Sequence, residues 1–396
     1  QPLPKTNLPK GLEIRLIPVG QAFVPAAGFR AGALFPSEHS TFRDATTTAQ
    51  IHQITNHPSI NHPTYFLQSS FTPDNRNVLF TSYRTGTPQL FEAAFPAGEL
   101  RQLTDGPPIH PFSLAIHPDG DLVFFVRAGS IWSIDRSTLT EKLIVDFPGA
   151  QLGECSLGGN GSWLTAAIKH EGKSGVVVGR TDGSGWHSIP FERTVIHPQF
   201  HPLDPEWLIF AGDPAPRMHR VRRDGSGLEC LYQHSNDEFV LHETFLGNTG
   251  DLIFVVWPFS LKRMNWSSLQ ISTIADFNAW HIAANRAGTK ILCDTNHPDE
   301  GLFLVDVHTG ARTQICKSES SNQGSQWRTS RYALKADFEA ARSGAQSNLS
   351  WMETPTDSVY GPQWTHPHPS FSHDERLVAF ASDRSGHAQV YVVEIG

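Results

Sequence analysis

The chain has 396 residues, of which 39% are hydrophobic and 18% charged. It can therefore bury a sizeable core, and its composition does not fit a disordered or coiled-coil chain. The content of 32 Gly, 28 Pro and 10% aromatic residues favours many short strands joined by tight turns. The net charge is −8 with no run of Lys or Arg, and no apolar stretch approaches the roughly 18 residues of a spanning helix. We therefore expect neither a nucleic-acid nor a membrane partner.

A turn followed by an apolar strand recurs along the chain. The last residues of these turns are Asn75, Gly120, Gly161, Pro205, Gly250, Gly288 and Glu375. Most of them are separated by about 40–45 residues, which is the period of a four-stranded propeller blade. The last interval is about twice as long, and we assign its polar residues 317–362 to an insertion at the edge of blade 6. The pattern predicts an all-β fold, a seven-bladed β-propeller over residues 41–396.

The first residues of the propeller are predicted to close its ring. Gln50–Thr55 resembles the outer strand that ends the first unit at Arg101–Thr104. As the outer strand of the last blade, this N-terminal segment would remove an open sheet edge. Residues 1–40 are assigned to an N-terminal extension.

One polar residue per blade falls seven or eight positions before each turn. At the start of an innermost strand, such a residue would lie at the mouth of the central channel. The residues are Gln68, Ser113, Glu154, His197, His242, His281 and His368. Four of the seven are histidines, and His is both the commonest metal ligand and the commonest general base. The competing interpretation is a water-filled channel lined by polar groups without a function.

The segment before the last unit adds a candidate metal site. His366 and His368 are two residues apart, so in an extended segment both imidazoles point the same way. With His281 from the neighbouring blade and the oxygen of Gln363 they would form a site of three nitrogens and one oxygen. Imidazole suits Zn, Cu, Fe or Ni, and an amide oxygen shifts the preference toward a harder ion such as Mn. His62 and Tyr65 precede the first inner strand and are placed at the channel mouth.

Several motifs resemble those of oligogalacturonate lyases, polysaccharide lyase family 22. The most specific is Gln363–Phe371, which resembles a Q-x-x-H-x-H-P-S-F segment of that family. The other matching segments are Thr41–Asp44, Gln53–Thr55, His62 with Tyr65, Phe66 and Gln68, His197 with Pro198, His242 with Glu243, and His281 with Asn285, Gly288 and Thr289. Their order and spacing extend the resemblance over about residues 41–396.

The resemblance implies a function and assigns residues to it. The function is β-elimination from 4-linked uronate oligosaccharides, as in pectin degradation, with a 4,5-unsaturated uronate as product. The implied cofactor is Mn²⁺, held by His281, Gln363, His366 and His368. The implied base is His242, and Arg217 is the implied assisting cation, with an ordinary surface arginine as the alternative. His62, Tyr65, Gln68 and His197 are then expected to bind the substrate.

This chemistry suits these residue types. The C5 proton of a uronate is only weakly acidic, because its removal places further negative charge on the adjacent carboxylate. A divalent cation or an arginine beside that carboxylate lowers the cost, and a neutral imidazole can then take the proton.

The sequence departs from the family in two loops, which leaves the substrate open. Phe210–Ala215 lacks the C-H-E-G-P motif of the family, and Lys169–Ser174 forms a short turn where the family has a long excursion. A lyase of the same mechanism acting on a rhamnosyl-glucuronate linkage is therefore an alternative.

Two other classes of protein also stay open. Ser382–Gly386 and Tyr83–Gly86 resemble repeats of noncatalytic, TolB-like binding propellers. A glycoside hydrolase would need paired carboxyl groups, and Glu154 is the one carboxyl residue at a channel position.

The location of the protein in the cell also has two readings. The sequons at Asn160, Asn265 and Asn348 and the absence of an initial Met favour a secreted or periplasmic protein. The alternative is the cytoplasm, where members of the family act on imported oligomers.

Overall fold

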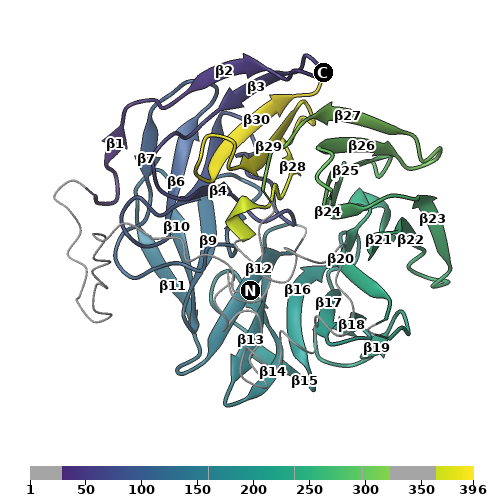
Figure 1. The fold of residues 1–396 in the computed structure, drawn as a ribbon. Coiled ribbons are helices and arrows are strands. Elements are labelled where there is room, and N and C mark those ends of the chain that lie inside the picture. The colour runs from purple at the N-terminus through teal and green to yellow at the C-terminus, as the bar shows by residue number, and fades with distance from the viewer. Residues whose placement is uncertain (1–28, 159, 236, 297, 322–362) are drawn as a thin grey trace, which may run out of the picture.

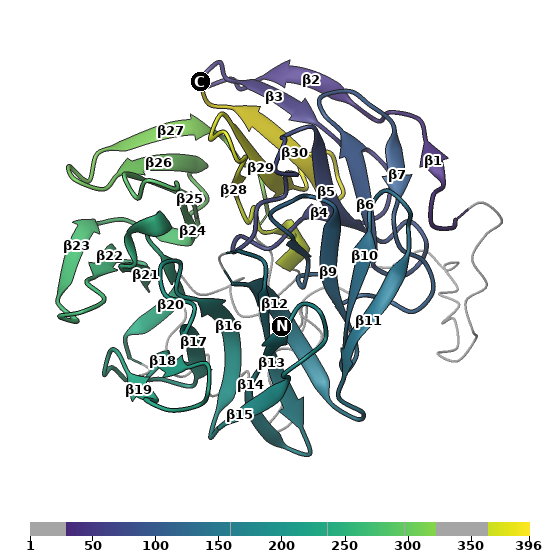
Figure 2. The same ribbon diagram turned by 180° about the vertical axis from the view of Figure 1, so that it is seen from behind.

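Seven antiparallel β-sheets surround a common axis in the computed structural model (Figures 1 and 2), which confirms the predicted seven-bladed β-propeller. The structure describes residues 29–158, 160–235, 237–296, 298–321 and 363–396, with the backbone alone described at Asp213 and Gln363. In these ranges the chain forms strands, turns and two 3-10 helices, η1 (Gly247–Thr249) and η2 (Gln363–Thr365).

Blades 1 to 3 follow one another along the chain, and each blade begins with its innermost strand. Blade 1 contains β4 (Asn61–Pro63), β5 (Asn77–Ser82), β6 (Gln89–Ala94), β7 (Leu100–Gln102) and, outermost, β1 (Leu34–Phe35). Blade 2 contains β8 (Ala115–Ile116), β9 (Leu122–Arg127), β10 (Ser130–Asp135) and β11 (Glu141–Asp146). Blade 3 contains β12 (Gln151–Leu157), β13 (Trp163–His170), β14 (Lys173–Arg180) and β15 (His187–Phe191).

Blades 4 to 7 complete the ring. Blade 4 contains β16 (Thr194–Phe200), β17 (Trp207–Asp213), β18 (Met218–Arg222) and β19 (Glu229–Cys230). Blade 5 contains β20 (Phe239–Phe245), β21 (Leu252–Trp257), β22 (Ser260–Met264) and β23 (Ile271–Ala275). Blade 6 contains β24 (Ala279–Ala284), β25 (Lys290–Thr295), β26 (Leu302–Asp306) and β27 (Arg312–Cys316). Blade 7 contains β28 (Ser370–Phe371), β29 (Leu377–Ser382), β30 (Gln389–Glu394), β3 (Gln50–Gln53) and β2 (Ser40–Arg43).

The repeated turns share one backbone conformation. The last turn residue has a positive φ in six of the seven copies, namely Asn75, Gly120, Gly161, Gly250, Gly288 and Glu375. Glycine adopts this left-handed conformation without steric cost, and asparagine tolerates it better than most residues. The seventh copy carries Pro205, whose ring fixes φ at a negative value. The sequence repeat therefore reflects a backbone requirement for tight turns.

The hydrophobic core lies between neighbouring blades. Val255 and Trp257 of β21 are buried together with Ile291 and Cys293 of β25 in one such layer. Each fully buried aliphatic or aromatic side chain contributes roughly 1.5–3 kcal/mol relative to an exposed one. A ring of such layers fixes each blade against both of its neighbours, and so holds the innermost strands in position around the axis.

The N-terminal segment closes the ring, as the sequence predicted. β3 pairs with β30 through Ile51–Val393, His52–Val392 and Gln53–Tyr391, and β2 adds a further strand outside it. β1 lies within the predicted N-terminal extension, and it pairs with β7 of blade 1. Residues 1–28 lie outside the described residues, as do residues 322–362 of the predicted insertion.

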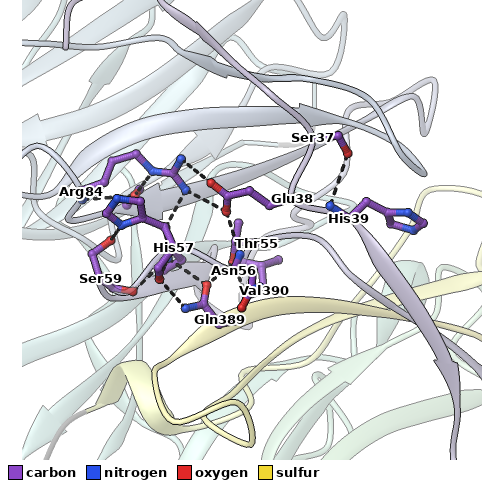
Figure 3. A network of polar contacts seen from close by, with 12 residues as sticks. Ser37, Glu38, His39, Thr55, Asn56, His57, Ser59, Arg84, Gln389 and Val390 are labelled. Atoms are coloured by element: carbon purple, nitrogen blue, oxygen red, sulfur yellow. Dashed lines mark hydrogen bonds and ion pairs between the residues drawn. The ribbon is translucent and has the colours of Figure 1, made fainter. Parts of the chain in front are cut away.

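A buried polar network joins the N-terminal segment to the seam between blades 1 and 7 (Figure 3). The Arg84 side chain is 1% exposed, and it donates to Glu38 Oε1 at 2.9 Å. Glu38 Oε2 accepts the backbone N–H of Asn56 at 2.7 Å. Thr55 Oγ1 donates to Gln389 Oε1 at 2.7 Å, and Gln389 Nε2 donates to the His57 carbonyl at 2.7 Å. One ion pair and several hydrogen bonds thus fix segments from both ends of the chain.

Membrane-spanning helices and sequons both bear on where the protein is located. Across the described ranges, no helix has the length and apolar character needed to cross a bilayer. Asn160 and Asn265 of two sequons are exposed, as glycosylation requires, whereas Asn348 lies outside the described residues. The location of the protein stays a prediction.

We expect Arg84→Met to destabilise the fold by about 3 kcal/mol, because it leaves the Glu38 carboxylate without its partner in the seam. The guanidinium also lies 5.5 Å from the Phe35 ring centroid and 5.2 Å from that of Phe91. Urea unfolding measures the loss. Arg76→Met is the matched control, since Arg76 is 83% exposed in its contact with Asp74, and its effect should stay within about 0.5 kcal/mol. Equal effects of the two substitutions would contradict a structural role for the Arg84 network.

Candidate active site

Four of the seven channel residues lie in β-bulges on the innermost strands of their blades. The pairing register shifts between Leu152 and Cys155, Ile196 and Gln199, Leu241 and Thr244, and Ala279 and Ile282. The residues skipped include Glu154, His197, His242 and His281. Their predicted placement at strand starts is therefore wrong: all four lie inside strands. A bulge leaves a residue unpaired and re-aims its side chain. The number of residues between a histidine and the next turn does not reveal a bulge.

Three channel histidines have a left-handed backbone. The φ angles are 54° at His197, 55° at His242 and 44° at His368. A non-glycine residue in this region costs on the order of 1–3 kcal/mol, and such residues cluster at functional sites. The surrounding blades must fix these conformations, and they thereby also fix where the imidazoles lie.

Three buried imidazoles converge between blades 6 and 7. One nitrogen from each of His281, His366 and His368 lies within 4.8 Å of the other two. The ring centroids of His281 and His368 are 4.2 Å apart, and those of His281 and His366 are 5.5 Å apart. The sequence predicted that His366 and His368 face the same way from an extended segment. They do converge, but the φ of 44° at His368 is not extended.

Asp294 on β25 orients His281, and the sequence analysis missed it. The backbone N–H of His281 donates to Asp294 Oδ1 at 2.6 Å, and His281 Nδ1 lies 2.8 Å from Asp294 Oδ2. When the carboxyl group is ionised, Nδ1–H donates to it and the Nε2 lone pair stays available, as in carboxylate–histidine–metal arrangements. An acidic residue within the apolar run of β25 was the available sequence signal. Burial raises the pKa of Asp294 well above its ordinary value, so a nearby cation would favour the ionised form.

The unmet hydrogen-bonding capacity of His368 also fits a metal. The residue is fully buried, and within the described residues neither of its ring nitrogens has a hydrogen-bond partner. Burial, with His281 and His366, lowers its pKa well below the ordinary value, so the imidazole is neutral with one free lone pair. The predicted fourth ligand, Gln363, begins η2, where its backbone alone is described. Its role as a ligand stays a prediction.

His242 lies beside this cluster on β20. Its ring centroid is 4.4 Å from that of His281 and 5.0 Å from that of Trp280. Burial, with smaller effects of His281 and His197, lowers the pKa of His242 well below its ordinary value. Its Nδ1 has no hydrogen-bond partner within the described ranges. A neutral imidazole with an unused nitrogen is a suitable proton acceptor.

Arg217 and Glu243 form a buried ion pair next to His242. Arg217 directly precedes β18 and is 8% exposed, so the alternative of an ordinary surface arginine is wrong. Its Nη2 lies 3.6 Å from Glu243 Oε1. Burial alone would raise the pKa of Glu243, but Arg217 and a hydrogen bond from His197 outweigh it and lower the pKa to about 2. Glu243 is therefore ionised at neutral pH and can hold Arg217 near the channel.

The Glu243 carboxylate also orients His197. The Nδ1 of His197 lies 3.2 Å from Glu243 Oε1, and its Nε2 lies 2.9 Å from the Tyr65 hydroxyl group. Nδ1–H therefore donates to the carboxylate and Nε2 accepts the proton of Tyr65. Tyr65 reaches this position because residues 64–70 leave the sheet between β4 and the bridge from Phe71 to Val78. The sequence analysis placed both residues at the channel mouth, but it did not predict this hydrogen bond.

The other predicted residues take different places. His62 is fully buried on β4; its Nδ1 donates to the Pro63 carbonyl at 2.9 Å, and burial lowers its pKa to about 4. Gln68 Nε2 donates to Ser156 Oγ at 3.4 Å. Ser113 Oγ donates to the His110 carbonyl at 2.8 Å and accepts the Val126 N–H at 2.9 Å. Ser113 thus supports a loop, whereas the substrate-binding roles of His62 and Gln68 stay predictions.

Comparisons with known proteins agree with the predicted resemblance. A family model described as oligogalacturonate lyase matches residues 30–170. An oligogalacturonate lyase of Dickeya dadantii (strain 3937) is 23% identical over 411 residues, covering 90% of this chain and 95% of that protein. An oligogalacturonide lyase of Pectobacterium atrosepticum is 22% identical over 418 residues, covering 92% and 98%.

Solved structures show the same fold. An oligogalacturonate lyase in complex with manganese has a TM-score of 0.77 at 18% identity, covering 93% of this chain and 99% of that chain. An oligogalacturonate lyase from Vibrio parahaemolyticus has a TM-score of 0.75 at 19% identity, covering 92% and 99%. The resemblance is thus confirmed: the chain is similar to oligogalacturonate lyases along nine-tenths of its length.

We expect Glu243→Gln to remove a pH-dependent part of the stability. The folded-state pKa of about 2 lies below the ordinary value of 4.5, so the ionised carboxylate stabilises the fold above pH 4.5. This contribution, about 3 kcal/mol, is lost as the pH falls toward 2. Urea unfolding of the wild type and the variant should therefore differ at pH 7 and converge as the pH is lowered. Exposed Glu192→Gln is the control, and a constant difference across the range would contradict the assignment.

Proposed function

We propose that the protein is a lyase that cleaves 4-linked uronate oligosaccharides by metal-assisted β-elimination. One observation carries the proposal: three buried imidazoles converge within 4.8 Å, and the neutral His242 lies 4.4 Å from one of them, ring to ring. The cluster suits a cation, and the neighbouring imidazole suits a proton acceptor. Together they match the two requirements for removing a proton next to a carboxylate.

His281, His366 and His368 would hold the metal, with Gln363 as the predicted fourth ligand. Three nitrogen donors leave open positions for a sugar carboxylate, and the manganese-bound relative supports Mn²⁺. When bound, the ion would supply positive charge for the carboxylate of the uronate. Asp294 engages the His281 Nδ1, which leaves Nε2 as the nitrogen available to the metal.

His242 would take the C5 proton of the uronate. Burial keeps its imidazole neutral, and the Trp280 and Phe66 rings, 5.0 and 5.2 Å away, hold its orientation. It lies in the bulge of β20, outside the β20–β21 pairing, and a bulge re-aims the side chain that it carries. The base is thus presented at a fixed place, and little reorganisation is required during the reaction.

Arg217 would assist as a cation close enough to His242 to act on it electrostatically. Its charge is held by Glu243 at 3.6 Å, so a substrate carboxylate would approach an arginine that is already oriented. The pair leaves little net charge in the free site, which lowers the cost of burying Arg217. Arg217 is thus suited to stabilise charge that develops on the substrate.

Oligogalacturonate is the proposed substrate, supported by the names of the full-length relatives. The turn between β13 and β14 is tight, with Glu171 and Gly172 joining the paired residues His170 and Lys173. The structure thus bears out the predicted short turn, and rhamnosyl-glucuronate oligosaccharides remain the second substrate class to assay.

The cleavage assay follows the short-wavelength ultraviolet absorbance of a 4,5-unsaturated uronate with each of the two substrate classes. We expect activity that a chelator abolishes and added Mn²⁺ restores. His242→Asn should lower kcat by about 10²–10⁴-fold, the usual effect of losing a general base. Asparagine is chosen because it tolerates the positive φ of 55°. The exposed His308→Asn is the control. No absorbance change with either substrate would refute the proposal and favour a binding propeller.

The metal assignment is tested by titrating Mn²⁺ into the metal-free protein and measuring the heat of binding. We expect Asp294→Asn to weaken binding about 10–100-fold, because the partner that orients His281 loses its charge. His368→Asn should abolish binding at the same site. Tight binding retained by both variants would contradict the proposed ligands, with His308→Asn again as the control.

A further inference from the structure

A buried carboxyl group at the channel has no role in the chemistry described above. Glu154 lies in the bulge of β12, directly before Cys155, as Glu243 lies directly before Thr244 in the bulge of β20. The residue is 2% exposed, and its carboxyl oxygens have no side-chain partner among the described residues, although the backbone N–H groups of Glu154 and His197 lie near them. An unpaired polar group at this depth is costly to the fold.

The other buried carboxyl groups near the channel are already engaged. Glu243 pairs with Arg217 and His197, and Asp294 accepts a hydrogen bond from His281. In the part of the chain that the structure describes, the Glu154 carboxyl group has no such side-chain partner. Its oxygens are therefore available to a ligand in the channel.

The position of Glu154 relates it to the base. Blades 3, 4 and 5 carry Glu154, His197 and His242 in the bulges of their innermost strands, so the three residues come from consecutive blades around the channel. The His197 and His242 ring centroids are 6.2 Å apart. Glu154 acts electrostatically on Tyr65, which hydrogen-bonds to His197. A carboxyl group thus lies two blades from the proposed base, next to the Tyr65–His197 pair.

We infer that Glu154 is the catalytic acid that protonates the leaving glycosidic oxygen. The inference rests on the proposed function, because it concerns the second half of the same elimination. Burial raises the pKa of Glu154, although His197 opposes the shift. This shift favours the protonated form that a donor needs, while burial favours the neutral imidazole of His242. Burial thus favours the uncharged form of both groups, a carboxylic acid that can donate a proton and an imidazole that can accept one.

His242 and Glu154 would each move one proton in the elimination. His242 takes the C5 proton, and the electrons of the C5–H bond form the C4=C5 double bond. The C4–O4 bond breaks, and O4 takes the proton of Glu154 as the second sugar leaves. The site then holds an imidazolium ion and a carboxylate. Return of one proton from His242 to Glu154 through solvent restores both groups, so no other reactant is consumed.

The test compares two substrates that differ in the leaving group. A sugar alkoxide needs a proton to leave, whereas a nitrophenolate does not, so a uronide carrying a nitrophenyl group at O4 bypasses the acid. We expect Glu154→Gln to lower kcat about 10²–10⁴-fold on the oligosaccharide and to leave the rate on the nitrophenyl uronide unchanged. His242→Asn should reduce both rates. Exposed Glu171→Gln, in the same blade, is the matched control.

Stability is measured alongside activity. Glutamine matches glutamate in size and carries no charge, so Glu154→Gln should melt at or above the wild-type temperature and bind Mn²⁺ normally. Glu154→Asp is the second variant; it retains an acid at a shorter reach, and it should again lose rate only on the oligosaccharide. Equal losses on both substrates, or no loss on either, would overturn the inference. A wild-type protein inactive on both substrates would instead refute the proposed function.

Discussion

The pairing of β3 with β30 is the constraint on which the rest of the site depends. His281 comes from blade 6, His368 precedes the innermost strand of blade 7, and Tyr65 lies in blade 1. These residues meet only if the first and last blades are held together. The backbone ladder at Ile51–Val393 provides this closure, and the Arg84–Glu38 pair reinforces it from inside the seam. The chemistry at the centre is therefore coupled to hydrogen bonds at the periphery.

The channel also buries ring nitrogens that have no hydrogen-bond partner among the described residues. His242 and His368 each leave at least one buried ring nitrogen without a partner in the described residues, and both also hold a left-handed backbone. Unpaired polar atoms and strained φ angles both lower stability. The hydrophobic layers between blades supply the free energy that tolerates them. A rigid ring thus allows an energetically unfavourable centre, as is common where a protein binds charge or moves protons.

The sequence predicted the architecture better than it predicted the local geometry. The turn period revealed the blades because each turn requires the same backbone, as at Gly120 and Gly250. A shared offset placed His197, His242 and His281 together for the same reason. The bulges were missed because they change register without changing the spacing of side chains along the chain. Asp294 was missed because its partner, His281, lies on another strand, and a contact of this kind leaves no local pattern.

The double use of the N-terminal segment has a consequence for biogenesis. β1 completes blade 1, while β2 and β3 complete blade 7, so a short stretch of chain spans the seam twice. His52 and Glu394 interact although 342 positions separate them. During synthesis, β2 and β3 leave the ribosome long before their partner strand exists. They must wait with an open edge that a chaperone or a second nascent chain can reach, and the final blade assembles only after β30 has left the ribosome.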